Sequence, residues 1–157
     1  MDFSQITDYL FIGMTPSVRD YNTLRALGVK QVINMRIEHR PRKDRHDPPL
    51  AFLWLPTFDS PLIPIPIKSL QRGAAAALET IRNGGKVYVH CAGGVHRGVA
   101  MGACILIAQG HKPEAAMDLI KSRRWLADPR AFYVRSRILR FAKEWAKIGP
   151  GDATHEK

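Results

Sequence analysis

One short segment of the chain holds residues whose types and spacing could do nucleophilic chemistry on a bound anion. It reads His90-Cys91-Ala92-Gly93-Gly94-Val95-His96-Arg97-Gly98, so an arginine follows the cysteine after five intervening residues. Apolar stretches flank the segment, and they predict a strand over 86–90 and a helix over 98–109. Where a strand turns into a helix, several backbone N–H groups lack partners and can converge on one anion. The segment therefore predicts an anion-binding loop.

The residues of this loop indicate how it could hold and attack a phosphate. Its two glycines allow backbone conformations that side chains exclude. The backbone amides that could close around the phosphate are those of Ala92, Gly93, Gly94, Val95 and His96. Arg97 could bind two phosphate oxygens through its planar fork, and the positive surroundings favour the nucleophilic thiolate of Cys91. The alternative is that Cys91 is a buried apolar side chain and the glycines form a plain turn.

Cleavage of a phosphate ester also needs a general acid that protonates the leaving oxygen. Asp59 is the leading candidate, because it follows the strand predicted over 51–55. Loops after parallel strands open on the same face of a sheet. The alternative for Asp59 is a turn-forming or helix-capping role. Three other acids are weaker candidates because they fall in a charged loop that we expect to be solvated: Glu38, Asp44 and Asp47.

The elements that must position these residues alternate between strands and helices. Apolar and β-branched runs predict strands over 9–13, 29–35, 51–55 and 86–90. Helical spacing, with capping and proline signals at the ends, predicts helices over 17–27, 68–82, 98–109, 113–124 and 129–147. An exposed loop is expected over 36–50, and the prolines of 57–67 exclude a helix or an inner strand. The pattern predicts an α/β fold: a central, mostly parallel sheet of four to five strands flanked by helices, with the cysteine loop between a strand and a buried helix.

The length and composition narrow the classes of protein that fit. A chain of 157 residues predicts one domain over 1–148, with a flexible tail over 149–157. The sequence shows neither an apolar run that could cross a bilayer nor a secretory signal, which favours a cytoplasmic protein. Its two cysteines favour reduced thiols, and Cys104 falls in the apolar helix, where we expect it in the core. The net charge of +10 favours encounters with anions without selecting one.

The residues resemble the dual-specificity group of the cysteine-based protein tyrosine phosphatases, especially its small single-domain members. The resemblance rests on the His-Cys-x5-Arg loop, the upstream Asp59, the opening segment 4–13 and the helix–strand joint 24–35, and it spans nearly all of residues 4–146. It implies Cys91 as nucleophile, Arg97 and the loop amides as phosphate ligands, and Asp59 as the acid that later activates water. It implies that His90 supports the loop and the thiolate through hydrogen bonds. Neither a metal nor an organic cofactor is implied.

Gly98 departs from the pattern of this family. Most relatives carry Ser or Thr directly after the arginine, and its hydroxyl assists the thiolate as it leaves the phosphocysteine. Glycine has no hydroxyl, so we expect slow breakdown of the intermediate rather than failure to form it. The departure also leaves open a weakly catalytic phosphate-binding or scaffold domain.

The expected function is that of a monomeric phosphomonoester hydrolase acting on phosphotyrosine and phosphoserine or phosphothreonine in proteins. The alternative is the same chemistry on a phosphoinositide or an RNA 5′-phosphate. A basic loop could contact such a polyanion, or it could be a solvated surface, and its cations are Arg40, Arg42, Lys43 and Arg45. A second basic stretch, Arg123-Arg124 together with the arginines of 130–140, is interpreted as an exposed helix face.

Overall fold

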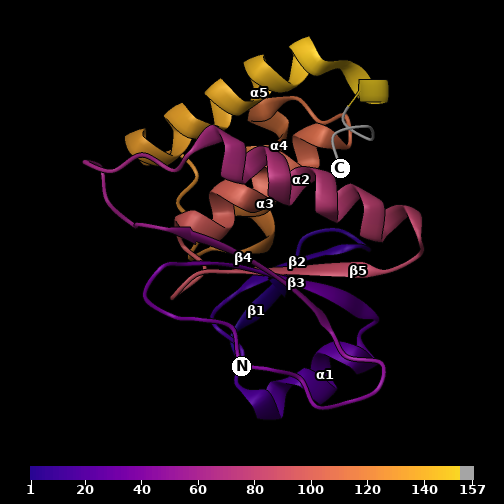
Figure 1. The fold of residues 1–157 in the computed structure, drawn as a ribbon. Helices are drawn as coiled ribbons and strands as arrows, with labels where there is room; N and C mark the ends of the chain where they lie inside the picture. Colours follow the sequence, from indigo (N-terminus) through magenta and orange to yellow (C-terminus); the bar gives the residue numbers. More distant parts are fainter. Residues whose placement is uncertain (153–157) are drawn as a thin grey trace.

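The fold is built on a five-stranded sheet with the strand order β1-β2-β5-β3-β4 (Figure 1). The computed structural model describes the backbone of residues 1–152 and the side chains of residues 1–148. The strands are β1 (Phe3–Gln5), β2 (Leu10–Gly13), β3 (Val29–Arg36), β4 (Ala51–Thr57) and β5 (Lys86–His90). β1 pairs antiparallel with β2, and the other pairings are parallel. The carboxyl ends of the four parallel strands therefore lie along one edge of the sheet.

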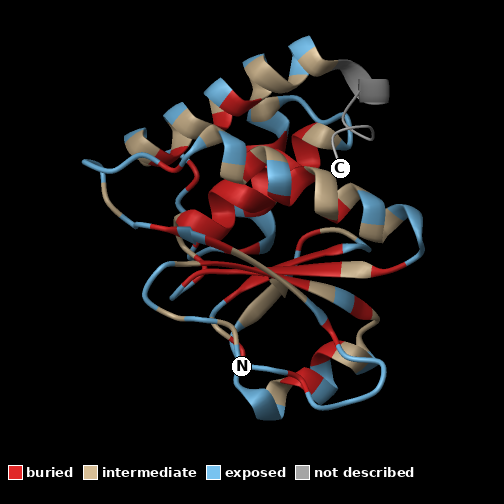
Figure 2. Ribbon diagram, in the orientation of Figure 1, coloured by how far each residue is buried: buried red, intermediate tan, exposed pale blue. Residues whose placement is uncertain are grey.

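Helices cover both faces of this sheet (Figure 1). One face carries the short 3-10 helix η1 (Val18–Asp20) and α1 (Tyr21–Ala26). The other carries α2 (Ile67–Arg82), α3 (Arg97–Ala108), α4 (Pro113–Arg123) and α5 (Phe132–Asp152). α3 lies against the sheet and also packs on α2, α4 and α5, so it is buried from Arg97 to Ile107 (Figure 2). The loop that precedes α3 thus rests on a firmly held helix.

Two apolar clusters, one on each side of the sheet, hold the layers together. The alternation of side chains along a strand divides its residues between them. In β2, Leu10 and Ile12 pack with the layer of four helices, whereas Phe11 packs with Tyr21 and Leu24 of α1. The central strands are apolar on both faces because both faces are covered.

The predicted α/β fold is confirmed, and three details differ from the prediction. β1 is an edge strand of three residues, which is too short to show an alternating pattern. The helix predicted from Pro129 begins at Phe132, and Pro129 itself lies in a turn. α5 continues to Asp152, so it includes the start of the predicted tail, and residues 153–157 lie outside the described residues.

The prediction of an exposed, solvated loop over 36–50 is wrong at its centre. Asp44 is only 5% exposed, and its carboxylate pairs with Arg25 of α1 and accepts the Leu50 N–H at 2.8 Å. Burial raises the pKa of Asp44, but the N–H groups of Leu50 and His46 and the Arg25 guanidinium outweigh it and lower the pKa to about 2. This connection is therefore anchored on α1.

Candidate active site

The predicted cysteine loop lies where β5 ends and α3 begins. β5 occupies the middle of the sheet, between β2 and β3, and its last residue is His90. Residues 91–96 form the loop, and Arg97 is the first residue of α3. Cys91 is 4% exposed at the base of the loop. The unpaired N–H groups at the start of α3 make this position favourable for negative charge.

Gly94 sets the shape of the loop. Its φ is +67°, a conformation that side chains rarely adopt. A Cβ at this position would also lie 2.9 Å from the carbonyl of Gly13 and from the guanidinium of Arg124. Glycine is therefore required here, because both the backbone angle and the close neighbours exclude a side chain.

Arg97 is buried at the far end of the loop, with one nitrogen left free. Its Nη1 donates to the carbonyl of Thr57 at 2.8 Å, and both terminal nitrogens bind the Glu38 carboxylate, at 3.0 and 2.8 Å. Arg97 is 4% exposed, and its Nε is buried without a hydrogen-bond partner among the described residues. An unsatisfied buried donor costs about 1–3 kcal/mol, so this nitrogen marks a place where a ligand would be bound favourably.

Glu38 contacts the site from the loop over 36–50, where its side chain is exposed as expected. The hydrogen bond from Arg97 is the main cause that lowers the pKa of Glu38 to about 2. Arg36 also binds Glu38 through Nε at 2.8 Å and donates from Nη1 to the Thr15 hydroxyl at 2.7 Å. That hydroxyl donates to the Cys91 carbonyl at 3.0 Å. A continuous chain of contacts therefore links the backbone of the cysteine to the arginine.

Arg124 supports the loop from its other side, so the interpretation of this residue as part of an exposed helix face is wrong. Its side chain is 2% exposed, and it donates to the carbonyls of Gly94 at 2.9 Å and Gly93 at 2.8 Å. It also pairs with Asp2 at 3.0 Å, ahead of β1. The sequence carries no local signal for these contacts, because Arg124 follows α4 and its partners lie far from it in the chain.

The structure brings Asp59 to the cysteine loop. The Tyr133 hydroxyl donates to Asp59 Oδ1 at 3.0 Å, and His96 Nδ1 lies 3.3 Å from Asp59 Oδ2. The rival candidate Asp44 is held instead by Arg25 on the other face of the sheet. Of the predicted acids, Asp59 contacts His96 of the loop, whereas the Glu38 carboxylate is engaged by Arg97.

His90 and Gly98 lie on either side of Cys91. His90 is 3% exposed, its Nδ1 is 3.4 Å from the Cys91 carbonyl, and burial lowers its pKa to about 4, so the ring is neutral near pH 7. A Cβ added at Gly98 would lie 3.5 Å from Cys91 Sγ and 3.3 Å from the Cys91 nitrogen. A hydroxyl at this position would therefore be within reach of the sulfur.

Cys104 is a fully buried core residue, as predicted, and burial raises its pKa. It lies in α3 beyond Gly98, about 9 Å along the helix axis at the usual rise per residue.

Among the described residues, no group of three or more His, Cys, Asp or Glu side chains could hold a metal ion. The described helices include none with the length and apolar character needed to cross a bilayer.

Comparisons with known proteins show the family to which the chain belongs. A family model described as "PTP-SAK: Swiss Army Knife protein, DSP-PTPase phosphatase domain" matches residues 2–141. Dual specificity phosphatase 28 of Mus musculus is 30% identical over 129 residues, which cover 81% of this chain and 76% of that protein.

Solved structures share the fold. The crystal structure of human DUSP28 has a TM-score of 0.81 at 23% identity and covers 92% of this chain and 95% of that one. The structure of PTPMT1 in complex with PI(5)P has a TM-score of 0.80 at 25% identity and covers 92% and 97% of the two chains. The chain belongs to the dual-specificity phosphatases of the cysteine-based protein tyrosine phosphatase superfamily.

Proposed function

We propose that this enzyme hydrolyses phosphomonoesters through a phosphocysteine on Cys91, and that its substrates are phosphotyrosine and phosphoserine or phosphothreonine residues of proteins. The observation that carries the proposal is the buried Arg97, whose Nε has no partner among the described residues. A phosphate in the loop would supply that partner. The loop amides from Ala92 to His96 and the start of α3 supply further donors.

In the first step, the Cys91 thiolate attacks phosphorus and the bond to the leaving oxygen breaks. Asp59 gives its proton to that oxygen, so the alcohol or phenol leaves neutral. Arg97 and the loop amides hold the phosphoryl oxygens, where charge develops in the transition state. The neutral ring of His90 takes no part in the proton transfer and supports the backbone at Cys91.

In the second step, a water attacks the phosphocysteine and Asp59 takes one of its protons. The sulfur leaves as the thiolate, and inorganic phosphate is released. Each cycle returns Cys91 and Asp59 to their starting forms, so no cofactor enters the balance.

The two cysteines give a matched test of the nucleophile. Cys91→Ser should abolish the turnover of p-nitrophenyl phosphate, because a serine hydroxyl is not ionised in this loop. Cys104→Ala changes the other thiol, in the core, and should retain turnover. Turnover by Cys91→Ser at the wild-type rate would overturn the proposal.

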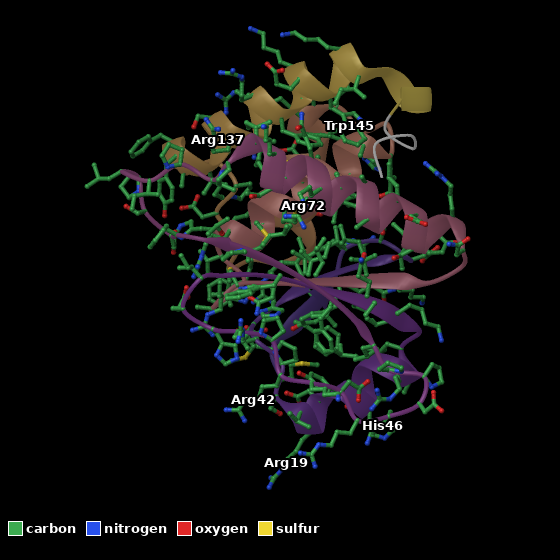
Figure 3. The ribbon with its side chains drawn as sticks, viewed as in Figure 1. Arg19, Arg42, His46, Arg72, Arg137 and Trp145 are labelled. Atoms are coloured by element: carbon green, nitrogen blue, oxygen red, sulfur yellow. The ribbon has the colours of Figure 1, made fainter. Side chains whose placement is uncertain are left out.

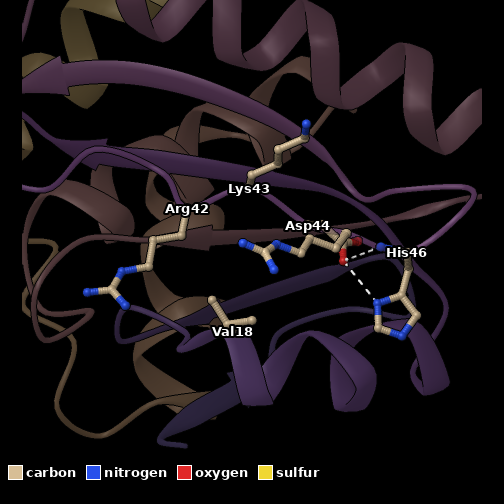
Figure 4. A pocket seen from close by; sticks show the side chains of 6 residues that line it. Val18, Arg42, Lys43, Asp44 and His46 are labelled. Carbon is tan, nitrogen blue, oxygen red and sulfur yellow. Dashed lines mark hydrogen bonds and ion pairs between the residues drawn. The ribbon is translucent and has the colours of Figure 1, made fainter.

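A second candidate substrate is a polyanion such as a phosphoinositide, because a basic pocket lies on the α1 side of the sheet. The pocket has a volume of about 450 Å³ and is lined by Arg42, Lys43 and Arg45 together with Val18, Asp44 and His46 (Figure 4). The Asp44 carboxylate is already engaged by Arg25, so the cationic side chains that line the pocket are available to bind an anion. One structural neighbour, PTPMT1, was solved in complex with PI(5)P.

Charge reversal separates the two substrate classes. If polyanions are the substrates, Arg42→Glu with Lys43→Glu should lower their turnover about tenfold or more while aryl phosphates change little. Arg72→Glu on α2, in the opposite layer, is the control (Figure 3). Equal turnover of a phosphoinositide by the double variant and by Arg72→Glu would favour protein substrates. We also propose that the enzyme is a cytoplasmic monomer; both of its cysteines are free thiols, which fits a reducing compartment.

A further inference from the structure

His96 lies in the cysteine loop, and its side chain meets two other connections of the chain. Its Nδ1 is 3.3 Å from Asp59 Oδ2, in the connection between β4 and α2. Its Nε2 is 3.6 Å from Asp128 Oδ2, in the connection between α4 and α5. The ring also lies against Tyr133, with 5.3 Å between ring centroids. One side chain therefore touches both of the segments that border the loop.

The connection that carries Asp59 has little else to hold it. Residues 58–63 include no buried residue, and Phe58, Leu62 and Ile63 are 45%, 88% and 46% exposed. A segment with few buried apolar contacts is not fixed by packing. The position of the Asp59 carboxyl therefore depends on its polar contacts, which among the described residues are those with His96 and Tyr133.

Asp128 is held more firmly, because its backbone is tied to the cysteine loop. The Asp128 N–H donates to the Val95 carbonyl at 3.0 Å. With one ring nitrogen directed at Asp128, the imidazole is oriented so that the other nitrogen faces Asp59. Arg97, which follows His96 in the chain, is engaged by Glu38.

We propose that His96 is a positioning residue that holds the Asp59 carboxyl over the phosphate bound in the cysteine loop. This inference rests on the proposed role of Asp59 as general acid. The Nδ1 contact places Asp59, and the contact between Nε2 and Asp128 orients the ring. A loss of the Nδ1 contact lets the exposed connection over 58–63 move, so proton transfer to the leaving oxygen suffers more than phosphate binding does.

Two amide substitutions separate the two ring contacts. The side-chain amide of asparagine lies near the position of the histidine Nδ1, and that of glutamine lies near the position of Nε2. His96→Asn therefore retains the contact with Asp59, whereas His96→Gln retains the contact with Asp128. His111→Gln, in the exposed connection after α3, is the matched control.

The measurement compares kcat/KM for two substrates. Phenyl phosphate has a poor leaving group that needs the acid, whereas dinitrophenyl phosphate has a good leaving group that does not need it. The ratio of kcat/KM for phenyl phosphate to kcat/KM for dinitrophenyl phosphate should fall about tenfold in His96→Gln and less in His96→Asn, in line with the cost of misplacing a catalytic group. The ratio should stay at the wild-type value in His111→Gln. Asp59→Asn should lower the ratio too, and adding His96→Gln to it should lower the ratio no further.

Inhibition by inorganic phosphate reports on binding in the cysteine loop itself. In His96→Gln, the inhibition constant for phosphate should change less than the ratio of the two kcat/KM values does. An unchanged ratio in His96→Gln, with a collapsed ratio in Asp59→Asn, would overturn the inference and leave the proposed function intact. A collapsed ratio in His96→Gln alone would overturn both the inference and the role of Asp59. Turnover retained in Cys91→Ser would contradict the proposed function instead.

Discussion

At the residue scale, Gly98 is where this chain departs from the pattern of its family, and the geometry makes that departure testable. A Cβ at Gly98 would be in ordinary contact with Cys91 Sγ, at 3.5 Å, and slightly tight against the Cys91 backbone nitrogen, at 3.3 Å. Gly98→Ser should therefore fit after a small shift and should raise steady-state turnover of p-nitrophenyl phosphate about three- to tenfold, because the hydroxyl can stabilise the leaving thiolate.

Gly98→Ala is the control for this substitution, because it adds the same Cβ without the hydroxyl. Turnover of Gly98→Ala should not exceed that of the wild type. An equal rise in both variants would assign the effect to packing, and an unchanged rate in Gly98→Ser would refute the role given to the missing hydroxyl.

Some residues of the site could be predicted from the sequence because their signal is local. Cys91, Gly94 and Arg97 lie within one loop between a strand and a helix, and their spacing alone indicates an anion site. The contacts that Glu38 and Arg124 make could not be predicted, because their partners lie 59 and 31 positions away, at Arg97 and Gly93. Only the folded chain brings those side chains together.

At the element scale, Arg124 ties the cysteine loop to the turn after α4 and to the residues ahead of β1. Arg124→Ala leaves the carbonyls of Gly93 and Gly94 without this donor, and the loop loses a support that its own backbone does not replace. The substitution should lower the free energy of unfolding by about 2–3 kcal/mol and weaken inhibition by inorganic phosphate. Urea denaturation and inhibition kinetics measure the two effects.

Arg123→Ala is the control at the neighbouring position, where the side chain is exposed. It should change neither quantity by much, since exposed substitutions lie within about 0.5 kcal/mol. Wild-type stability together with wild-type phosphate inhibition in Arg124→Ala would show that the loop keeps its shape without this arginine.

Most elements could be predicted because each carries its own periodicity or end signal. The apolar run before Cys91 and the helix after it match β5 and α3 within a residue or two. The start of α5 was misplaced because proline is also common in turns, and Pro129 lies in one. The burial of Asp44 could not be predicted, since it depends on Arg25 of an element that precedes it in the chain.

At the scale of the whole molecule, Asp44 makes the stability depend on pH. Its pKa is lowered from 3.8 to about 2 in the folded protein, so its contribution is complete above the unfolded value and is lost as the pH falls toward 2. A shift of this size corresponds to about 2 kcal/mol. Asp44→Asn should therefore unfold more easily than the wild type at pH 7, and the difference should shrink as the pH approaches 2.

Asp47→Asn, in the same connection, is exposed and serves as the control for this pH effect. Urea denaturation at several pH values measures all three proteins. Parallel curves for the wild type and Asp44→Asn between pH 5 and pH 2 would contradict the role of Asp44.

The surplus of cations is distributed over both layers of the molecule rather than confined to the site. Arg19 and Arg42 project on the α1 side, and Arg72 and Arg137 lie in the layer of four helices (Figure 3). The net charge of +10 thus favours encounters with anions in general, while selection of a phosphate falls to the cysteine loop.

The central claim is that Cys91 forms a phosphocysteine whose breakdown limits turnover. A millisecond-resolved time course of p-nitrophenyl phosphate cleavage, run beside Cys91→Ser, tests it most directly. We predict a burst of p-nitrophenol of about one equivalent per enzyme, then slow steady release, with neither phase in Cys91→Ser. Release no greater than the background of Cys91→Ser would contradict the account and leave a domain that binds phosphate without cleaving its esters.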